Sequence, residues 1–124
     1  MSVMSSSLSF AEEFQAPGQL VIQPERFAAA MHLQLRELAR LAHVHKATVL
    51  EAPGNLRLQT YMREALKVIS AALNVTQGTD RAIYWFRNAP IPQFGHQTPE
   101  QLVAAHHTDA VLSYLNSIAG GSAR

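Results

Sequence analysis

Two pairs of histidines are the side chains in this sequence that come closest to a metal-binding or reactive site. His43 and His45 are separated by one residue, and His106 and His107 are adjacent. Imidazole binds metals, but structural sites usually add cysteine or carboxylate ligands at set spacings, and the chain has no cysteine. We therefore expect these histidines to lie at helix junctions, with no metal and no other cofactor bound.

The other polar residues do not form a catalytic pattern. No nucleophile is accompanied by a base and an orienting group, and no glycine-rich phosphate loop or pair of acid–base carboxylates occurs. Asp80 and Asp109 each stand where a helix is expected to begin, which is a common use of aspartate. The sequence therefore predicts no catalytic residues and a protein that is not an enzyme.

A basic segment suggests a surface that binds DNA. Residues 35–42 and 46–51 resemble two short helices joined by a tight turn, with Ala39 where the helices would cross. Segment 24–74 holds seven Lys and Arg against four Glu, a net charge of +3. The candidate DNA-binding residues are Arg36, Arg40, His45, Lys46, Thr48 and Arg57, the arginines toward phosphates and the others toward the groove. The alternative is a trihelical packing unit that binds no DNA by itself.

A run of four large apolar residues, Ile83 to Phe86, cannot be buried by one face of a helix, because successive helical residues point about 100° apart. The run contains the only tryptophan, Trp85, and five of the nine aromatic residues lie between positions 84 and 114. Part of this cluster must be core. We expect the rest to meet a protein partner, since aromatic residues are enriched at interface centres.

Four motifs stand in and after this run: Gly78-x-Asp80-x-Ala82-x-x-Trp85-Phe86, Asn88-x-Pro90-x-Pro92-x-Phe94-Gly95, Thr98-Pro99-Glu100-x-Leu102-Val103 and Asp109-Ala110-Val111-Leu112-x-Tyr114-Leu115. Together they resemble the toxin-binding domain of the Xre/MbcA/ParS antitoxins, over about residues 75–120. Residues 35–49 resemble the helix-turn-helix of the Xre family. In two places where these families usually have glycine, this chain has histidine, at His43 and at His106 or His107.

The resemblance implies a small antitoxin of a type II toxin–antitoxin system. Its partner would be a RES-domain toxin, an enzyme that destroys cellular NAD, and the complex would repress its own operon. The C-terminal region would cover or enter the toxin's active-site cleft. The candidate toxin-binding residues are Trp85, Phe86, Phe94, Tyr114, Leu115, Ile118, Gly120, Gly121, Ser122 and Arg124. Two alternatives remain: a DNA-binding transcriptional repressor whose C-terminal half only dimerises it, and a purely structural homodimer.

Helices must position these residues, because alanine and leucine dominate the composition and β-branched residues are scattered singly. We predict helices over 24–31, 34–42, 46–51, 58–73, 79–88 and 99–105, and a last one after His107 that ends at Gly120-Gly121. The predicted N-caps are Asn55, Thr79 or Asp80, and Thr98. The fold class is all-α, with an Xre-like trihelix, a long core helix and a small helical toxin-binding domain.

The expected organisation is a flexible N-terminal arm at 1–23, a helix-turn-helix domain at 24–74 and a toxin-binding domain with a C-terminal tail at 75–124. Only 15% of the residues are charged, against about 25% in a typical soluble chain. We therefore expect a protein partner on the charge-poor C-terminal half, in a homo-oligomer or in a hetero-oligomer with the toxin. Without a signal peptide or a long apolar run, the expected location is the cytoplasm, not a membrane.

Overall fold

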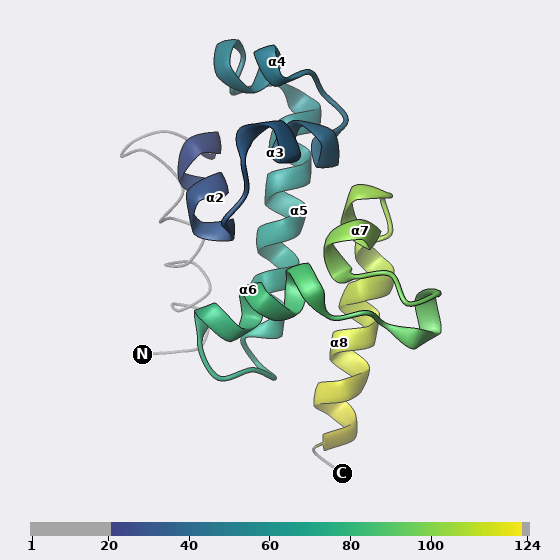
Figure 1. The fold of residues 1–124 in the computed structure, drawn as a ribbon. Helices are drawn as coiled ribbons and strands as arrows, with labels where there is room; N and C mark the ends of the chain where they lie inside the picture. Colours follow the sequence, from purple (N-terminus) through teal and green to yellow (C-terminus); the bar gives the residue numbers. More distant parts are fainter. Residues whose placement is uncertain (1–20, 123–124) are drawn as a thin grey trace. The chain divides into compact units, whose positions relative to one another are not determined.

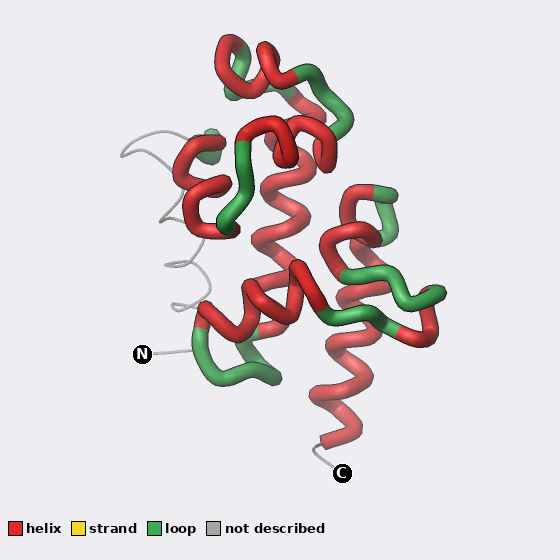
Figure 2. The backbone as a smooth tube through the Cα atoms, in the orientation of Figure 1, coloured by secondary structure: helices red, strands yellow, loops and turns green. Residues whose placement is uncertain are grey.

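The computed structural model describes residues 21–122, which form seven α-helices and one short 3₁₀ turn (Figures 1 and 2). The helices are α2 (Pro24–Met31), α3 (Leu35–Ala42), α4 (Lys46–Glu51), α5 (Leu56–Ala72), α6 (Thr79–Asn88), α7 (Pro99–Ala104) and α8 (Thr108–Ser122), and the 3₁₀ turn η1 is Pro92–Phe94. The predicted all-α class is confirmed. The expected arm at 1–23 lies outside the described residues except for its last three.

The chain divides into two compact units, residues 1–63 and residues 64–124. The division falls inside α5, which is one continuous helix, whereas the domains expected from the sequence meet at position 74. In the first unit α2 packs against α3, and α3 packs against α4. Its fully buried side chains include Phe27, Met31, Leu38, Val49, Leu58 and Met62. These helices are too short to be stable alone, so burial of their apolar faces holds them in place.

A buried glutamine, Gln59 on α5, anchors the start of the first described segment. Its side-chain amide accepts a hydrogen bond from the Ile22 backbone N–H and donates to the Ile22 and Pro53 carbonyl oxygens, at 2.8–2.9 Å. Ile22 itself is buried. Ile22 precedes α2 and Pro53 follows α4. Because one buried amide pairs with backbone groups of both, it ties these two points of the chain to the same place on α5.

In the second unit α6 packs against α7, and α7 packs against α8. Between α6 and α7 the chain forms a closed loop, in which Ile91 and Gln97 pair as an isolated antiparallel bridge around η1. The buried apolar residues of this unit include Leu66, Ile69, Phe86, Ile91, Val103 and Val111. The loop is therefore held from both ends, by the bridge and by burial of Ile91.

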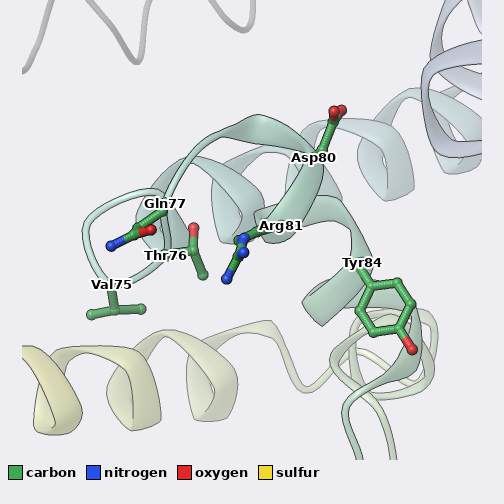
Figure 3. A pocket seen from close by; sticks show the side chains of 6 residues that line it. All are labelled: Val75, Thr76, Gln77, Asp80, Arg81 and Tyr84. Atoms are coloured by element: carbon green, nitrogen blue, oxygen red, sulfur yellow. The ribbon is translucent and has the colours of Figure 1, made fainter.

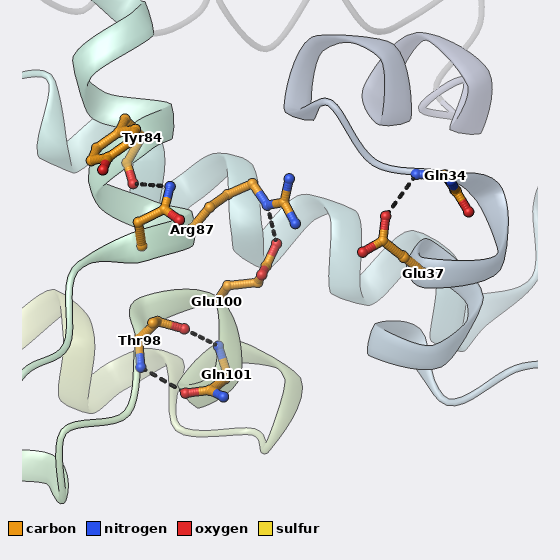
Figure 4. A network of polar contacts seen from close by, with 8 residues as sticks. Gln34, Glu37, Tyr84, Arg87, Thr98, Glu100 and Gln101 are labelled. Atoms are coloured by element: carbon orange, nitrogen blue, oxygen red, sulfur yellow. Dashed lines mark hydrogen bonds and ion pairs between the residues drawn. The ribbon is translucent and has the colours of Figure 1, made fainter.

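Two of the predicted helix starts are confirmed. The Asn55 side chain accepts the Leu58 backbone N–H at 3.1 Å at the start of α5. At α7, Thr98 Oγ1 accepts the Gln101 backbone N–H at 3.1 Å, and Gln101 Oε1 accepts the Thr98 N–H at 2.9 Å (Figure 4). This reciprocal pair is the capping box that the Thr98-Pro99 sequence predicts.

Two other helix limits differ from the prediction. The N-cap of α6 is Gly78, at φ 96°, so Thr79 and Asp80 are inside the helix and do not cap it. Helix α8 does not end at Gly120 but continues to Ser122. A glycine costs a helix only about 1 kcal/mol relative to alanine and breaks no hydrogen bond. A helix held by packing further back can therefore continue through glycine, so α8 extends past the predicted limit at Gly120-Gly121.

Within residues 21–122, every non-glycine residue with a positive φ is a histidine: His32, His43, His96 and His106, at φ 59–68°. His43 ends α3 and donates its backbone N–H to the Ala39 and Arg40 carbonyls, as a left-handed helix cap does. The resemblance described above puts glycine at position 43 and at position 106 or 107, and in this chain His43 and His106 both have the left-handed conformation. Histidine is one of the residue types enriched in this conformation.

Candidate functional site

The aromatic run on α6 divides between core and surface. Phe86 is completely buried, as are Ala82 and nearly all of Ile83, and these three form the inner face of the helix. Tyr84 is 70% exposed and Trp85 is half-buried. The structure therefore presents Tyr84 and part of Trp85 to solvent, and it buries Phe86 on the inner face of α6.

A second aromatic contact joins the loop after α6 to α8. The rings of Phe94 and Tyr114 meet edge to face, with centroids 6.2 Å apart and planes at 71°. Both side chains are half-buried. One turn further along α8, Ile118 is 38% exposed, whereas Leu115 is buried. The outer side of α8 thus carries Tyr114 and Ile118, and its inner side carries Leu115.

A partly buried ion pair connects α6 to α7. Arg87 Nε donates to Glu100 Oε2 at 3.0 Å, and the two side chains are 24% and 11% exposed (Figure 4). Glu100 is the residue after Pro99 in the first turn of α7, where a carboxylate is favoured by the helix dipole. The ion pair therefore links α7 to α6, while the capping box of Thr98 and Gln101 fixes where α7 begins.

The C-terminal candidates are only partly described. Gly120 lies within α8 and is half-buried. Gly121 and Ser122 belong to the last turn of the helix, and Arg124 lies outside the described residues. The region that the sequence assigns to an irregular tail therefore begins, as far as it is described, as helix.

In the first unit, four side chains lie around one pocket of about 440 Å³ at the turn between α3 and α4: His43, His45, Thr48 and Arg57. Val44 and Asn55 complete the lining, which includes no carboxylate. The Arg57 guanidinium approaches the His43 carbonyl oxygen at 3.5 Å. The structure thus brings together three of the six candidate DNA-binding residues, His45, Thr48 and Arg57.

The other three candidate DNA-binding residues do not line this pocket. Arg36, Arg40 and Lys46 are exposed on α3 and α4. Arg36 Nη2 donates to the Gln34 side chain at 2.9 Å, and the Gln34 backbone N–H donates to Glu37 at 3.0 Å (Figure 4). Arg36 is therefore held near the start of α3, whereas Arg40 is exposed near its end.

The described residues contain no group of three or more His, Asp or Glu side chains arranged to hold a metal ion. No helix within residues 21–122 is both long enough and apolar enough to span a bilayer.

Sequence reasoning missed three features that the structure shows. It did not include Tyr84 among the candidate toxin-binding residues, although Tyr84 lies off the face that Ala82 and Phe86 define on a helix, so helical spacing could have found it. It also missed Gln59 and the contribution of Asn55 to the pocket in the first unit. No local signal marks these two, because their partners come from other segments of the chain.

The second unit is a small helical domain that exposes Tyr84 and part of Trp85, residue types that are enriched at protein interfaces. Comparison with known families identifies that domain: residues 71–121 match the family described as the antitoxin Xre/MbcA/ParS C-terminal toxin-binding domain. No curated protein and no solved structure gives a significant match to the chain.

The match confirms the resemblance inferred from the motifs between Gly78 and Leu115. It indicates an antitoxin of a toxin–antitoxin system, whose partner is a toxin protein. It also implies a regulator that acts by binding its toxin.

Proposed function

We propose that this chain is the antitoxin of a type II system that binds a RES-domain toxin, an enzyme that degrades NAD, and occludes its active site in the cytoplasm. The observation that carries the proposal is the toxin-binding family match over 71–121. The RES toxin in particular follows from the resemblance of the sequence motifs. The charge-poor composition of 75–118, with five charged residues, agrees with a surface covered by another protein.

The proposed toxin-binding residues fall into two groups by burial. Trp85, Phe94, Tyr114 and Ile118 are partly accessible and would contact the toxin directly. Phe86 and Leu115 are buried, so their proposed part is to support α6 and α8 beneath the contact surface. This division predicts that substitution of the buried pair lowers stability first and that substitution of the accessible group lowers chiefly toxin affinity.

Gly120, Gly121, Ser122 and Arg124 form the proposed occluding end of the chain. Because α8 continues to Ser122, we propose that the last helical turn and Arg124, and not an extended tail, enter the toxin's cleft. Glycine has no side chain, so two successive glycines make the end of the helix narrow. Arg124 supplies a positive charge at this end of the described helix's sequence.

The test is co-expression with the protein encoded beside this chain's gene, scored by growth and by cellular NAD. The full chain is expected to restore both, and a chain lacking Ala119–Arg124 is expected to restore them incompletely while keeping its helical circular dichroism. Full protection by the shortened chain would contradict the occlusion step. If the neighbouring protein is harmless alone, or toxic and unrelieved by the full chain, the antitoxin proposal fails. The DNA-binding repressor with a dimerising C-terminal half would then remain.

We also propose that the first unit binds operator DNA and that the toxin complex represses its own operon. The convergence of His45, Thr48 and Arg57 on one pocket without a carboxylate supports this, as does the net charge of +3 over 24–74. Arg36, Arg40 and Lys46 are exposed cations nearby, available to phosphates.

DNA binding is tested with the chain's own promoter, with and without toxin and at two salt concentrations. Each lost phosphate contact should weaken the salt dependence of the affinity, and Arg57→Ala should do so without changing sequence preference. No binding in any state would leave the trihelix as a packing unit.

A further inference from the structure

The second unit also has an open groove, which is lined by residues between Val75 and Tyr84. It has a volume of about 650 Å³ and lies between the α5–α6 turn and the first turns of α6 (Figure 3). The lining residues are Val75, Thr76, Gln77, Asp80, Arg81 and Tyr84. All six fall within the segment that matches the toxin-binding family.

Local hydrogen bonds fix the shape of this groove. The Ala72 carbonyl, at the end of α5, accepts the backbone N–H groups of Val75 and Thr76 at 3.0 Å and the Thr76 hydroxyl at 2.9 Å. Gly78, at φ 96°, then turns the chain into α6 in a conformation that residues with a side chain rarely adopt. The groove is therefore formed before any partner binds, which reduces the entropy lost on binding.

The groove combines apolar surface with a positive charge. Val75 is 38% exposed and Tyr84 is 70% exposed, which makes them two of the exposed large apolar residues of the described chain. Arg81 is exposed, and its side chain lies between Thr76 and Tyr84 (Figure 3). Among residues 21–122, no side chain forms an ion pair or hydrogen bond with Arg81. Asp80 points away from Arg81 in this view.

The spacing on α6 extends this surface. Arg81, Tyr84 and Trp85 stand at positions i, i+3 and i+4, so they share one side of the helix. Arginine, tyrosine and tryptophan are the residue types most enriched among those that dominate binding energy at protein interfaces. Ala82 and Phe86 are buried on the other side, so substitutions at 81 and 84 leave the packing of α6 intact.

We propose that this groove binds a segment of the toxin that carries an acidic side chain beside an apolar one. The carboxylate pairs with Arg81, and the apolar side chain packs against Val75 and Tyr84. This inference rests on the proposed function and adds a contact surface that includes neither the aromatic pair Phe94–Tyr114 nor the C-terminal end. The occupant is the toxin because the groove belongs to the toxin-binding segment and offers a cation with no partner among the described residues.

The experiment measures the dissociation constant between the full-length chain and the purified protein encoded beside its gene. The variants are Tyr84→Ala and Arg81→Glu, and the matched controls are Leu56→Ala, which also removes an exposed apolar side chain, and Lys67→Glu, which also reverses an exposed charge in the second unit. We expect each groove variant to raise Kd at least tenfold, about 1.4 kcal/mol, and each control to change it less than twofold. Arg81→Glu should act largely on the association rate at low salt.

Each result decides the inference. A wild-type complex whose Kd is unchanged in both groove variants overturns the groove and leaves the proposed function standing. Failure of the wild-type chain to bind the protein encoded beside its gene overturns both the groove and the proposed function. If the variants instead lower the oligomeric mass of the protein measured in solution without toxin, the groove binds a second copy of the chain, and the inference is wrong. Circular dichroism of each variant shows whether a loss of binding is a loss of fold.

Discussion

Replacement of His43 by glycine should stabilise the protein. His43 holds a left-handed backbone, with φ 61° and ψ 43°, and this conformation costs a residue with a side chain about 1–2 kcal/mol. Glycine does not have this cost, but it loses about 0.5–1 kcal/mol more backbone entropy on folding. The difference predicts a gain of about 0.5–1 kcal/mol in the free energy of unfolding. For a chain of this size that corresponds to a rise in Tm of about 2–4 °C.

The hydrogen bonds described at this turn belong to the backbone and survive the substitution. The His43 N–H donates to the Arg40 carbonyl at 3.2 Å, and the Val44 N–H donates to the Ala39 carbonyl at 2.9 Å. The His43 carbonyl accepts from Arg57. The assay is thermal unfolding followed by circular dichroism, with urea unfolding as a second measure of stability.

His45, two residues further, provides the matched control. It is also an exposed histidine in the same turn, but its φ is −78° and it is the N-cap of α4. Glycine there relieves no strain, so His45→Gly should leave Tm unchanged or slightly lower. His96→Gly, at φ 63° in the second unit, should repeat the gain. If His43→Gly and His45→Gly lower Tm equally, the reasoning from the left-handed turn is refuted.

Three further substitutions test contacts of the structure. Thr98→Ala removes the N-cap of the six-residue α7 and should cost about 1 kcal/mol in urea unfolding; an unchanged midpoint would argue against the capping box. Glu100→Ala leaves Arg87 partly buried without this carboxylate and should cost about 1–3 kcal/mol, whereas a double-mutant cycle with Arg87→Ala should show a coupling above about 0.5 kcal/mol. Gln59→Ala leaves the buried Ile22 backbone groups without their partner and should cost at least about 2 kcal/mol, with loss of amide-exchange protection at Ile22 as the direct readout.

Much of the helical framework was predictable because its signals are local. Pro24, Asn55 and the Thr98-Pro99 pair begin helices where backbone N–H groups would otherwise lack a partner, and each does so in the structure. The start of α6 was not predictable in this way. Gly78 precedes two residues that are themselves good caps, and the choice among them depends on how the α5–α6 turn closes on Ala72.

The sequence predicted which segment contains the candidate site, but not which of its side chains are exposed. The motifs around Trp85 identify the family of the segment, but a run of four apolar residues on a helix does not say which of them face inward. Tertiary packing decides this, because it buries Phe86 and leaves Tyr84 in solvent. The meeting of Arg57 on α5 with His45 and Thr48 at the start of α4 likewise depends on the tertiary fold, which brings these two segments together.

By itself, the sequence determined the all-α class, most helix limits and the antitoxin family of residues 71–121, because periodicity, capping residues and motif spacing act over a few positions of the chain. Only the tertiary structure decided which aromatic residues are core, that histidines occupy the left-handed turns, and that α8 continues through Gly120 to Ser122. These features depend on free energies of burial and packing that come from residues distant in sequence, and such contributions override local preferences of about 1 kcal/mol.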